Sequence, residues 1–322
     1  MKLLDRLLSK RFAFRFVYND EYWMVDLGPH VVPVRKYRLI YERLVAAGAR
    51  KTDFLASPMI AEEDILRVHT AKYVRKLQTG ELSRAEIMVL ELPFTAELAR
   101  FAWLHVGGTA LAAETALAEG LAFHIGGGFH HAFADHGEGF CALNDVAIAV
   151  ERLRAQGRIG RAMIVDLDVH QGNGTAALFA GRPDVFTYSL HQMDIYPAEK
   201  PPGTLDVGLW SGDGDDKYLA ALRADYPRIA DEFKPDLVVY LAGADPLAGD
   251  KIGGLACTMA GLAERDRIIL EETRRRGIPV AIVLGGGYGR DLDDTVEAHM
   301  NTIRAAQRAQ RLARRSSERS PR

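Results

Sequence analysis

The chain contains six short apolar runs that alternate with longer segments of helical spacing. The runs lie at residues 12–18, 121–125, 161–166, 185–190, 236–241 and 279–284. They are rich in β-branched residues and do not alternate with polar ones, which is typical of parallel strands covered on both faces. The helical segments lie at residues 34–47, 96–118, 144–155, 215–233, 255–275 and 291–307. The sequence therefore predicts an α/β fold with a mainly parallel central sheet and helices on both faces.

We expect a single catalytic domain over residues 1–307, because no internal repeat and no Pro/Ser-rich linker divides the 322-residue chain. A hydrophobic content of 48% excludes a disordered chain, and a net charge of −2 argues against nucleic-acid binding through bulk charge. Residues 308–322 are rich in Arg and Ser. We interpret them as a basic, frayed or disordered tail, with a nucleic-acid-binding or partner-binding tail as the alternative.

The sequence gives no indication of export or membrane insertion. Charged residues interrupt the apolar residues of the first 15 positions, so that no continuous signal-peptide core forms. No apolar run approaches the roughly 18 residues that span a bilayer. The 2 cysteines are too few for a disulfide framework or a Cys-rich zinc module. We therefore predict a cytoplasmic protein without membrane contact.

Ligands in open α/β sheets bind at the carboxyl ends of the strands, so the residues after each predicted strand are informative. The run at 121–125 is followed by Gly126, Gly127 and Gly128, then by Phe129, His130 and His131. Glycines let the backbone turn tightly or approach a ligand. Neighbouring imidazoles resist sharing positive charge. This combination favours a functional pair over two histidines that merely pack in the core.

Two carboxylates and an imidazole follow the strand at 161–166. In extended chain, Asp166, Asp168 and His170 lie on one face. Burying them together is costly unless a cation neutralises them. The alternative is helix capping, for which Asn173 alone would suffice. Asp245, after the strand at 236–241, completes an Asp–His–Asp set that leaves a fourth zinc position open.

The strand at 279–284 is followed by Gly285, Gly286 and Gly287, and then by Tyr288. The glycines allow a strip of backbone to line a narrow slot. Tyr288 then points into that slot, where its hydroxyl can donate a hydrogen bond to a carbonyl oxygen that gains negative charge.

Together these segments resemble the zinc-dependent histone deacetylase superfamily, which also includes acetoin-utilisation proteins and acetylpolyamine amidohydrolases. Six ordered segments carry the resemblance, namely residues 126–131, 138–145, 166–175, 188–191, 242–245 and 285–288. The segment Asp-Leu-Asp-Val-His-Gln-Gly-Asn-Gly is most similar to the class IV branch and its bacterial relatives. The resemblance implies an arginase/deacetylase-like fold with the active site at the carboxyl ends of the strands.

The resemblance also implies the metal ions and their ligands. Asp168, His170 and Asp245 are expected to hold one zinc ion. A potassium ion is expected nearby, with ligands from Asp166, Asp168, His170, Ser189 and Leu190.

The resemblance further implies a division of catalytic roles. His131 is expected to be the general base, and His130, held by Asp166, its electrostatic support. Tyr288 is expected to polarise the scissile carbonyl. Asn173 stands where many family members have Asp, which should make His131 less basic and shift the pH optimum down.

The substrate tunnel is the part of the resemblance with most departures. Gly139, Phe140 and Gly286 are expected to line the tunnel for a lysine side chain. Residues 192–203 do not match the short aromatic-Pro-Gly loop of class I, and residues 25–37 are expected to form another wall of the rim.

The predicted activity is removal of an acyl group from Nε-acyl-lysine in proteins or peptides. The alternative within the fold is an acetylpolyamine or other small-amide hydrolase, for which Asp194 and Glu199 could supply carboxylates at the rim. An arginase-like binuclear hydrolase would need an Asp-x-His-x-Asp string, which the chain lacks, and an inactive scaffold would be expected to have lost some of these residues. The preferred acyl chain and the oligomeric state do not follow from the sequence.

Overall fold

A computed structural model describes residues 12–319 of the chain, and residues 1–11 and 320–322 lie outside the described part. Its centre is an eight-stranded sheet in the order β2-β1-β3-β8-β7-β4-β5-β6, with every neighbouring pair parallel. The strands are β1 (Arg15–Tyr18), β2 (Phe54–Ala56), β3 (Leu121–His124), β4 (Ala162–Asp166), β5 (Val185–Gln192), β6 (Leu205–Leu209), β7 (Leu237–Leu241) and β8 (Val280–Val283). The predicted single-domain α/β fold is confirmed.

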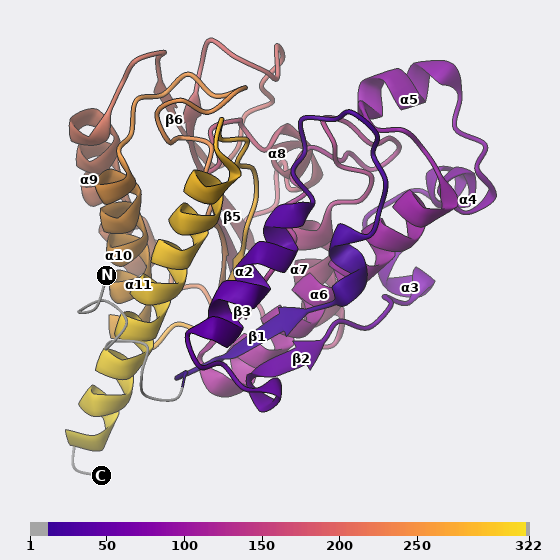
Figure 1. The fold of residues 1–322 in the computed structure, drawn as a ribbon. Helices are drawn as coiled ribbons and strands as arrows, with labels where there is room; N and C mark the ends of the chain where they lie inside the picture. The colour runs from indigo at the N-terminus through magenta and orange to yellow at the C-terminus, as the bar shows by residue number, and fades with distance from the viewer. Residues whose placement is uncertain (1–11, 320–322) are drawn as a thin grey trace.

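Helices cover both faces of this sheet (Figure 1). The long helices are α2 (Arg35–Ala46), α6 (Ala96–Glu119), α7 (Asp145–Ala155), α9 (Asp215–Phe233), α10 (Met259–Arg275) and α11 (Leu292–Arg319). Shorter ones are η1 (Asp20–Trp23), η2 (Lys51–Asp53), α3 (Glu62–Ile65), α4 (Ala71–Thr79), α5 (Arg84–Leu90) and α8 (Asn173–Leu178). On one face α6 packs on the sheet with α7 beside it, whereas α9, α10 and α11 lie on the other. The inner strands are therefore shielded on both sides, and β3, β4 and β7 are buried along their whole length.

All six predicted strands are present, but the two strands at the edges of the sheet are not predicted from the sequence. β2 has only three residues, and none of them is buried. β6 buries a single residue, Leu209. Neither strand carries the continuous apolar run that identifies a buried parallel strand, because each edge strand is covered less completely than the strands inside.

The last helix is longer than predicted. α11 continues from Leu292 to Arg319, past the expected end at residue 307, and Ala309 and Gln310 are buried. The side chain of Gln310 explains part of this difference, since its Nε2 donates to Glu119 O and its Oε1 accepts from Arg274 Nε. Residues 308–319 thus continue the helix, where the sequence predicted a frayed or disordered tail over residues 308–322, and residues 320–322 lie outside the described residues.

The strand order determines where the site lies. β3, β8, β7 and β4 are consecutive in the sheet, so the segments that follow them meet along one edge. These are the four strands after which the sequence places its histidines, aspartates and glycine-rich turns.

Candidate metal and catalytic site

Asp168, His170 and Asp245 come together in the structure as one buried cluster. One candidate ligand atom from each lies within 4.8 Å of the others. His170 Nδ1 is 3.2 Å from Asp168 Oδ1 and 3.6 Å from Asp245 Oδ2. The backbone fixes both carboxylates, because Val169 N donates to Asp245 Oδ1 and Gly286 N donates to Asp168 Oδ2.

The donor set fits a zinc ion. Asp245 Oδ2 is buried and has no hydrogen-bond partner among the described residues, so a carboxylate oxygen is left for a cation. Burial and the nearby Asp168 raise the pKa of Asp245 to about 7, which shows the cost of placing the two carboxylates together. Two oxygens and one imidazole nitrogen match a zinc site with an open position.

His130 and His131 have opposite electrostatic environments. Burial lowers the pKa of His130, but the carboxylates of Asp166 and Asp168 outweigh it and raise that pKa to about 9. The contact is direct, since His130 Nδ1 is 2.7 Å from Asp166 Oδ2. Burial lowers the pKa of His131 well below its usual value, and charge on His130 and His170 lowers it further. One imidazole is therefore held as a cation and its neighbour as a neutral base.

Asn173 contacts His131 as the resemblance implies. Its Oδ1 is 2.7 Å from His131 Nδ1. The capping alternative fails, because the N-cap of α8 is Gly172 and Asn173 is already the first residue of the helix. The side chain of Asn173 instead lies between His131 and Glu138, with Nδ2 donating to Glu138 Oε1 at 2.6 Å.

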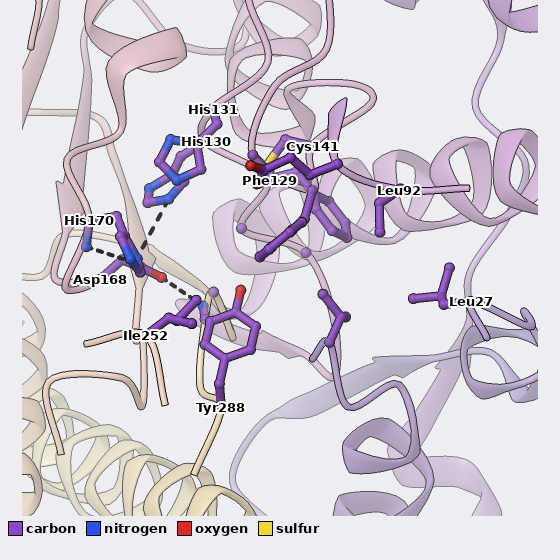
Figure 2. A pocket seen from close by; sticks show the side chains of 18 of the residues that line it. Leu27, Leu92, Phe129, His130, His131, Cys141, Asp168, His170, Ile252 and Tyr288 are labelled. Atoms are coloured by element: carbon purple, nitrogen blue, oxygen red, sulfur yellow. Dashed lines mark hydrogen bonds and ion pairs between the residues drawn. The ribbon is translucent and has the colours of Figure 1, made fainter. Parts of the chain in front are cut away.

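Tyr288 stands across the cavity from His130 and His131 (Figure 2). Tyr288 N donates to Asp250 Oδ2, which fixes the backbone at this residue. Gly286 must lack a side chain, since a Cβ there would lie 2.0 Å from Asp245 Oδ2. Burial raises the pKa of Tyr288 well above its usual value, so its hydroxyl keeps its proton.

A cavity of about 220 Å³ opens above the cluster. Its polar end contains His130, His131, Asp168 and His170, and Leu27 and Leu92 lie on the far side (Figure 2). All three predicted tunnel residues line it, namely Gly139, Phe140 and Gly286.

Phe140 forms part of this wall in an unusual backbone conformation. Its φ is +68°, which L-residues other than glycine rarely adopt. Phe140 N donates to Leu90 O at the end of α5, and the ring lies 6.1 Å from that of Tyr288. The surrounding fold holds this residue in place, as expected of a binding-site wall.

The cavity also contains residues to which the sequence assigns no role. Tyr196 and Ile252 line the cavity, and so does Lys36, whose Nζ donates to Gly285 O at 2.8 Å. Tyr196 and Lys36 belong to the segments 192–203 and 25–37, which were expected only as parts of the rim. Glu138 lies in the segment 138–145, and the resemblance assigns it no role. No local pattern in the sequence identifies these contacts, because they join loops far apart in the chain.

The predicted potassium ligands are close together. Asp166 on β4 is paired in register with Ser189 on β5, next to Leu190. Ser189 Oγ lies 2.9 Å from His191 Nδ1. The potassium ion stays a prediction.

Comparisons with known proteins agree with this geometry. Residues 30–303 match the family model described as histone deacetylase domain. The chain is 40% identical over 295 residues to an uncharacterized protein of Picosynechococcus sp., covering 91% of this chain and 98% of that protein. It is 31% identical over 317 residues to histone deacetylase 2 of Arabidopsis thaliana, covering 91% and 82%. The crystal structure of the HDA15 HD domain superposes with a TM-score of 0.76 at 25% identity, covering 91% of this chain and 88% of that one.

The fold and the site define an α/β domain with a candidate metal centre at the carboxyl ends of its strands. The family match covers most of the chain, and the chain therefore belongs to the histone deacetylase family. As a member, it has the family's deacetylase type of hydrolytic activity. Within residues 12–319, no helix is long and apolar enough to cross a membrane.

Proposed function

We propose that this protein is a zinc-dependent hydrolase that removes an acyl group from Nε-acyl-lysine in proteins or peptides. One observation carries the proposal. The Asp168–His170–Asp245 cluster, with its unpartnered Asp245 Oδ2, lies at the polar end of a cavity that His131 and Tyr288 also line. A zinc ion bound there supplies a Lewis acid that polarises the amide carbonyl and lowers the pKa of water toward about 7.

The side chains around the cavity supply the proton transfer and the stabilisation of negative charge. Neutral His131 accepts the proton of the attacking water molecule and later delivers it to the leaving amine. His130 stays positively charged beside Asp166 and stabilises negative charge as it develops. The hydroxyl of Tyr288 donates a hydrogen bond to the carbonyl oxygen.

The cavity walls favour the stem of an acylated lysine. Phe140, Leu92 and Ile252 provide apolar surface, on which a methylene chain is more stable than in water. A free ammonium group would have to lose its hydration there, so the charge-neutral acyl-lysine fits better. Asp194, considered for polyamine binding, already accepts hydrogen bonds from Ser211 and Gln192.

The test is hydrolysis of one set of substrates by the zinc-loaded protein. The set contains peptides with acetyl-, lactyl-, octanoyl- and myristoyl-lysine, together with N-acetylputrescine. We expect release from a peptide that stops with a zinc chelator and returns with added zinc. The ranking of the acyl groups then measures the depth of the cavity. Hydrolysis of N-acetylputrescine alone would replace the proposal by the small-amide alternative, and no hydrolysis of any substrate by zinc-loaded protein would contradict both.

The metal assignment has its own test. Asp245→Ala removes the carboxylate that has a free oxygen, and we expect protein purified with this substitution to lack stoichiometric zinc. Asp194→Ala is the matched control and should keep its zinc, because Asp194 lies outside the cluster. A fully loaded Asp245→Ala protein would refute the ligand set.

A further inference from the structure

Behind His131 lies a chain of side chains that ends in a carboxylate. Asn173 Oδ1 is 2.7 Å from His131 Nδ1, and Asn173 Nδ2 donates to Glu138 Oε1 at 2.6 Å. The same carboxylate oxygen accepts from the hydroxyl of Tyr196 at 2.6 Å. The side chain of Glu138 is 18% exposed, so this chain connects the buried base to a carboxylate that is partly accessible to solvent.

The direction of these hydrogen bonds follows from what each group can do. A carboxylate only accepts, so the Asn173 amide turns its NH₂ group toward Glu138 and its oxygen toward His131. Gly174 N donates to the same Asn173 oxygen at 3.0 Å, which supports this orientation. An amide oxygen also only accepts, so His131 carries its proton on Nδ1. Its Nε2 is then left with a free lone pair.

We propose that Glu138 is a positioning residue that acts through Asn173 to hold His131 in the Nδ1–H tautomer. The proposal rests on the proposed function, in which His131 is the general base. Nε2 takes the proton of the attacking water and returns it to the leaving amine, while the Nδ1 proton stays on the bond to Asn173. Glu138 also binds Tyr196, so one carboxylate anchors both the base and a wall of the cavity.

The backbone around Glu138 does not depend on its side chain. Glu138 N donates to Cys141 O and Cys141 N donates back to Glu138 O. Gly139 N donates to Val89 O and thereby ties the loop to the end of α5. Changing the side chain at position 138 should therefore leave the fold in place, together with the loop that carries the wall residues Gly139 and Phe140.

The test compares two substitutions in the full-length, zinc-loaded protein. Glu138→Gln keeps an acceptor for Asn173, whereas Glu138→Met removes it at similar size. We expect Glu138→Met to lower kcat about 10- to 100-fold with little change in KM, since a base in the wrong tautomer cannot accept the proton. Glu138→Gln should retain most of kcat. Glu62→Gln is the control, because the Glu62 carboxylate accepts from Gln78 and contacts neither Glu138 nor Asn173 among the described residues.

A second readout does not need activity. The imidazole ¹⁵N shifts of the 10 histidines report the tautomer of each ring, and His131→Gln identifies the signals of His131. We expect the Nδ1–H form of His131 in the wild type and in Glu138→Gln, and an increased share of the Nε2–H form in Glu138→Met. In an Asn173→Asp background, Glu138→Met should have no such effect, because the new carboxylate accepts the Nδ1 proton directly.

Two results would overturn the proposal. One is an unchanged His131 tautomer in Glu138→Met, whether or not kcat falls, because a loss of rate alone indicates a structural role. The other is an equal loss of kcat when Glu138→Met is introduced into the wild type and into the Asn173→Asp variant. If the wild type hydrolyses no acyl amide, the proposed function fails. The ¹⁵N spectra still show whether Glu138 controls the tautomer of His131.

Discussion

Gly286 shows how strictly single residues are constrained around the metal ligands. A Cβ at this position would lie 2.0 Å from Asp245 Oδ2 and 2.8 Å from Asp168 Oδ2. Both carboxylates are buried, so neither can move into solvent. We expect Gly286→Ala to fold but to bind zinc substoichiometrically, as measured by elemental analysis. Gly160→Ala is the control, because its Cβ would meet only Asp236 at 3.5 Å. Full zinc occupancy in Gly286→Ala would contradict the geometry.

Tyr288 is the residue whose contribution should be almost purely catalytic. Tyr288→Phe keeps the ring that faces Phe140 at 6.1 Å and removes only the hydroxyl. We expect kcat on an acyl-lysine peptide to fall about 100- to 1,000-fold, the loss typical of one oxyanion donor. Zinc content and thermal midpoint should match the wild type. Turnover at the wild-type rate would exclude Tyr288 from the mechanism.

The residues that the sequence predicts share one property. Each lies in a segment that follows a predicted buried strand, as Asp168, His170, Asp245 and His131 do, so their positions in the sequence bring them to one edge of the sheet. The family resemblance then supplies their roles. Glu138 and Tyr196 differ, because their contact joins two loops separated by 58 positions. Such a contact depends on the packing of loops and leaves no periodic pattern in the sequence. The hydrogen bonds that link His131 to Glu138 through Asn173 are therefore visible only in the structure.

Helix α10 holds two of the loops that carry the candidate metal ligands. Arg265 is 1% exposed, and its Nη1 donates to Leu167 O at 3.3 Å and to Gly243 O at 2.6 Å. These carbonyls lie one and two residues before Asp168 and Asp245. The guanidinium is neutralised by Asp266, which is also buried. One helix thus fixes the ends of β4 and β7 relative to each other.

We predict that Arg265→Met destabilises the fold and weakens zinc binding. Removing one partner of a buried ion pair costs about 3–5 kcal/mol, since Asp266 stays buried without its counter-charge. Urea unfolding and zinc titration measure the two effects. Arg267→Met on the same helix is the control, because its pairs with Glu264 and Glu271 are partly exposed and contribute about 1 kcal/mol or less. Equal stabilities of the two variants would refute this role of α10.

Elements at the edges of the molecule were predicted less well than those inside it. Continuous apolar runs in the sequence identify the inner strands, whereas β2 and β6 are short and partly exposed. The extension of α11 includes the buried Ala309 and also Gln310, which is hydrogen-bonded to Arg274 of α10 and to Glu119 of α6, whereas composition alone favours a frayed end. A strand that is buried on both faces has a continuous apolar run in the sequence, whereas a strand or helix that packs on one side only does not.

The molecule as a whole should lose stability in mild acid because it buries neutral histidines. Burial lowers the pKa of His69 to about 4 and that of His124 to about 3. His69 Nε2 accepts a hydrogen bond from Asn144 N, which requires the neutral ring. In the unfolded chain both histidines take up a proton near pH 6.5. The unfolded state therefore binds more protons between about pH 6.5 and 4, and the stability falls as the pH falls through this window.

We expect the free energy of unfolding to decrease by about 1 kcal/mol per pH unit for each such histidine between roughly pH 6 and 5. His130 does not oppose this trend, because a pKa raised to about 9 makes its contribution constant below about pH 6. Asp245 without a bound metal does oppose it, because its pKa is raised to about 7, but this contribution is the same in the two proteins compared below. His69→Gln offers an uncharged acceptor to Asn144 N and should reduce the slope by the share of one histidine. Denaturant unfolding of both proteins at a series of pH values measures the difference. Identical slopes would mean that His69 is protonated in the folded protein, against the hydrogen bond that it accepts.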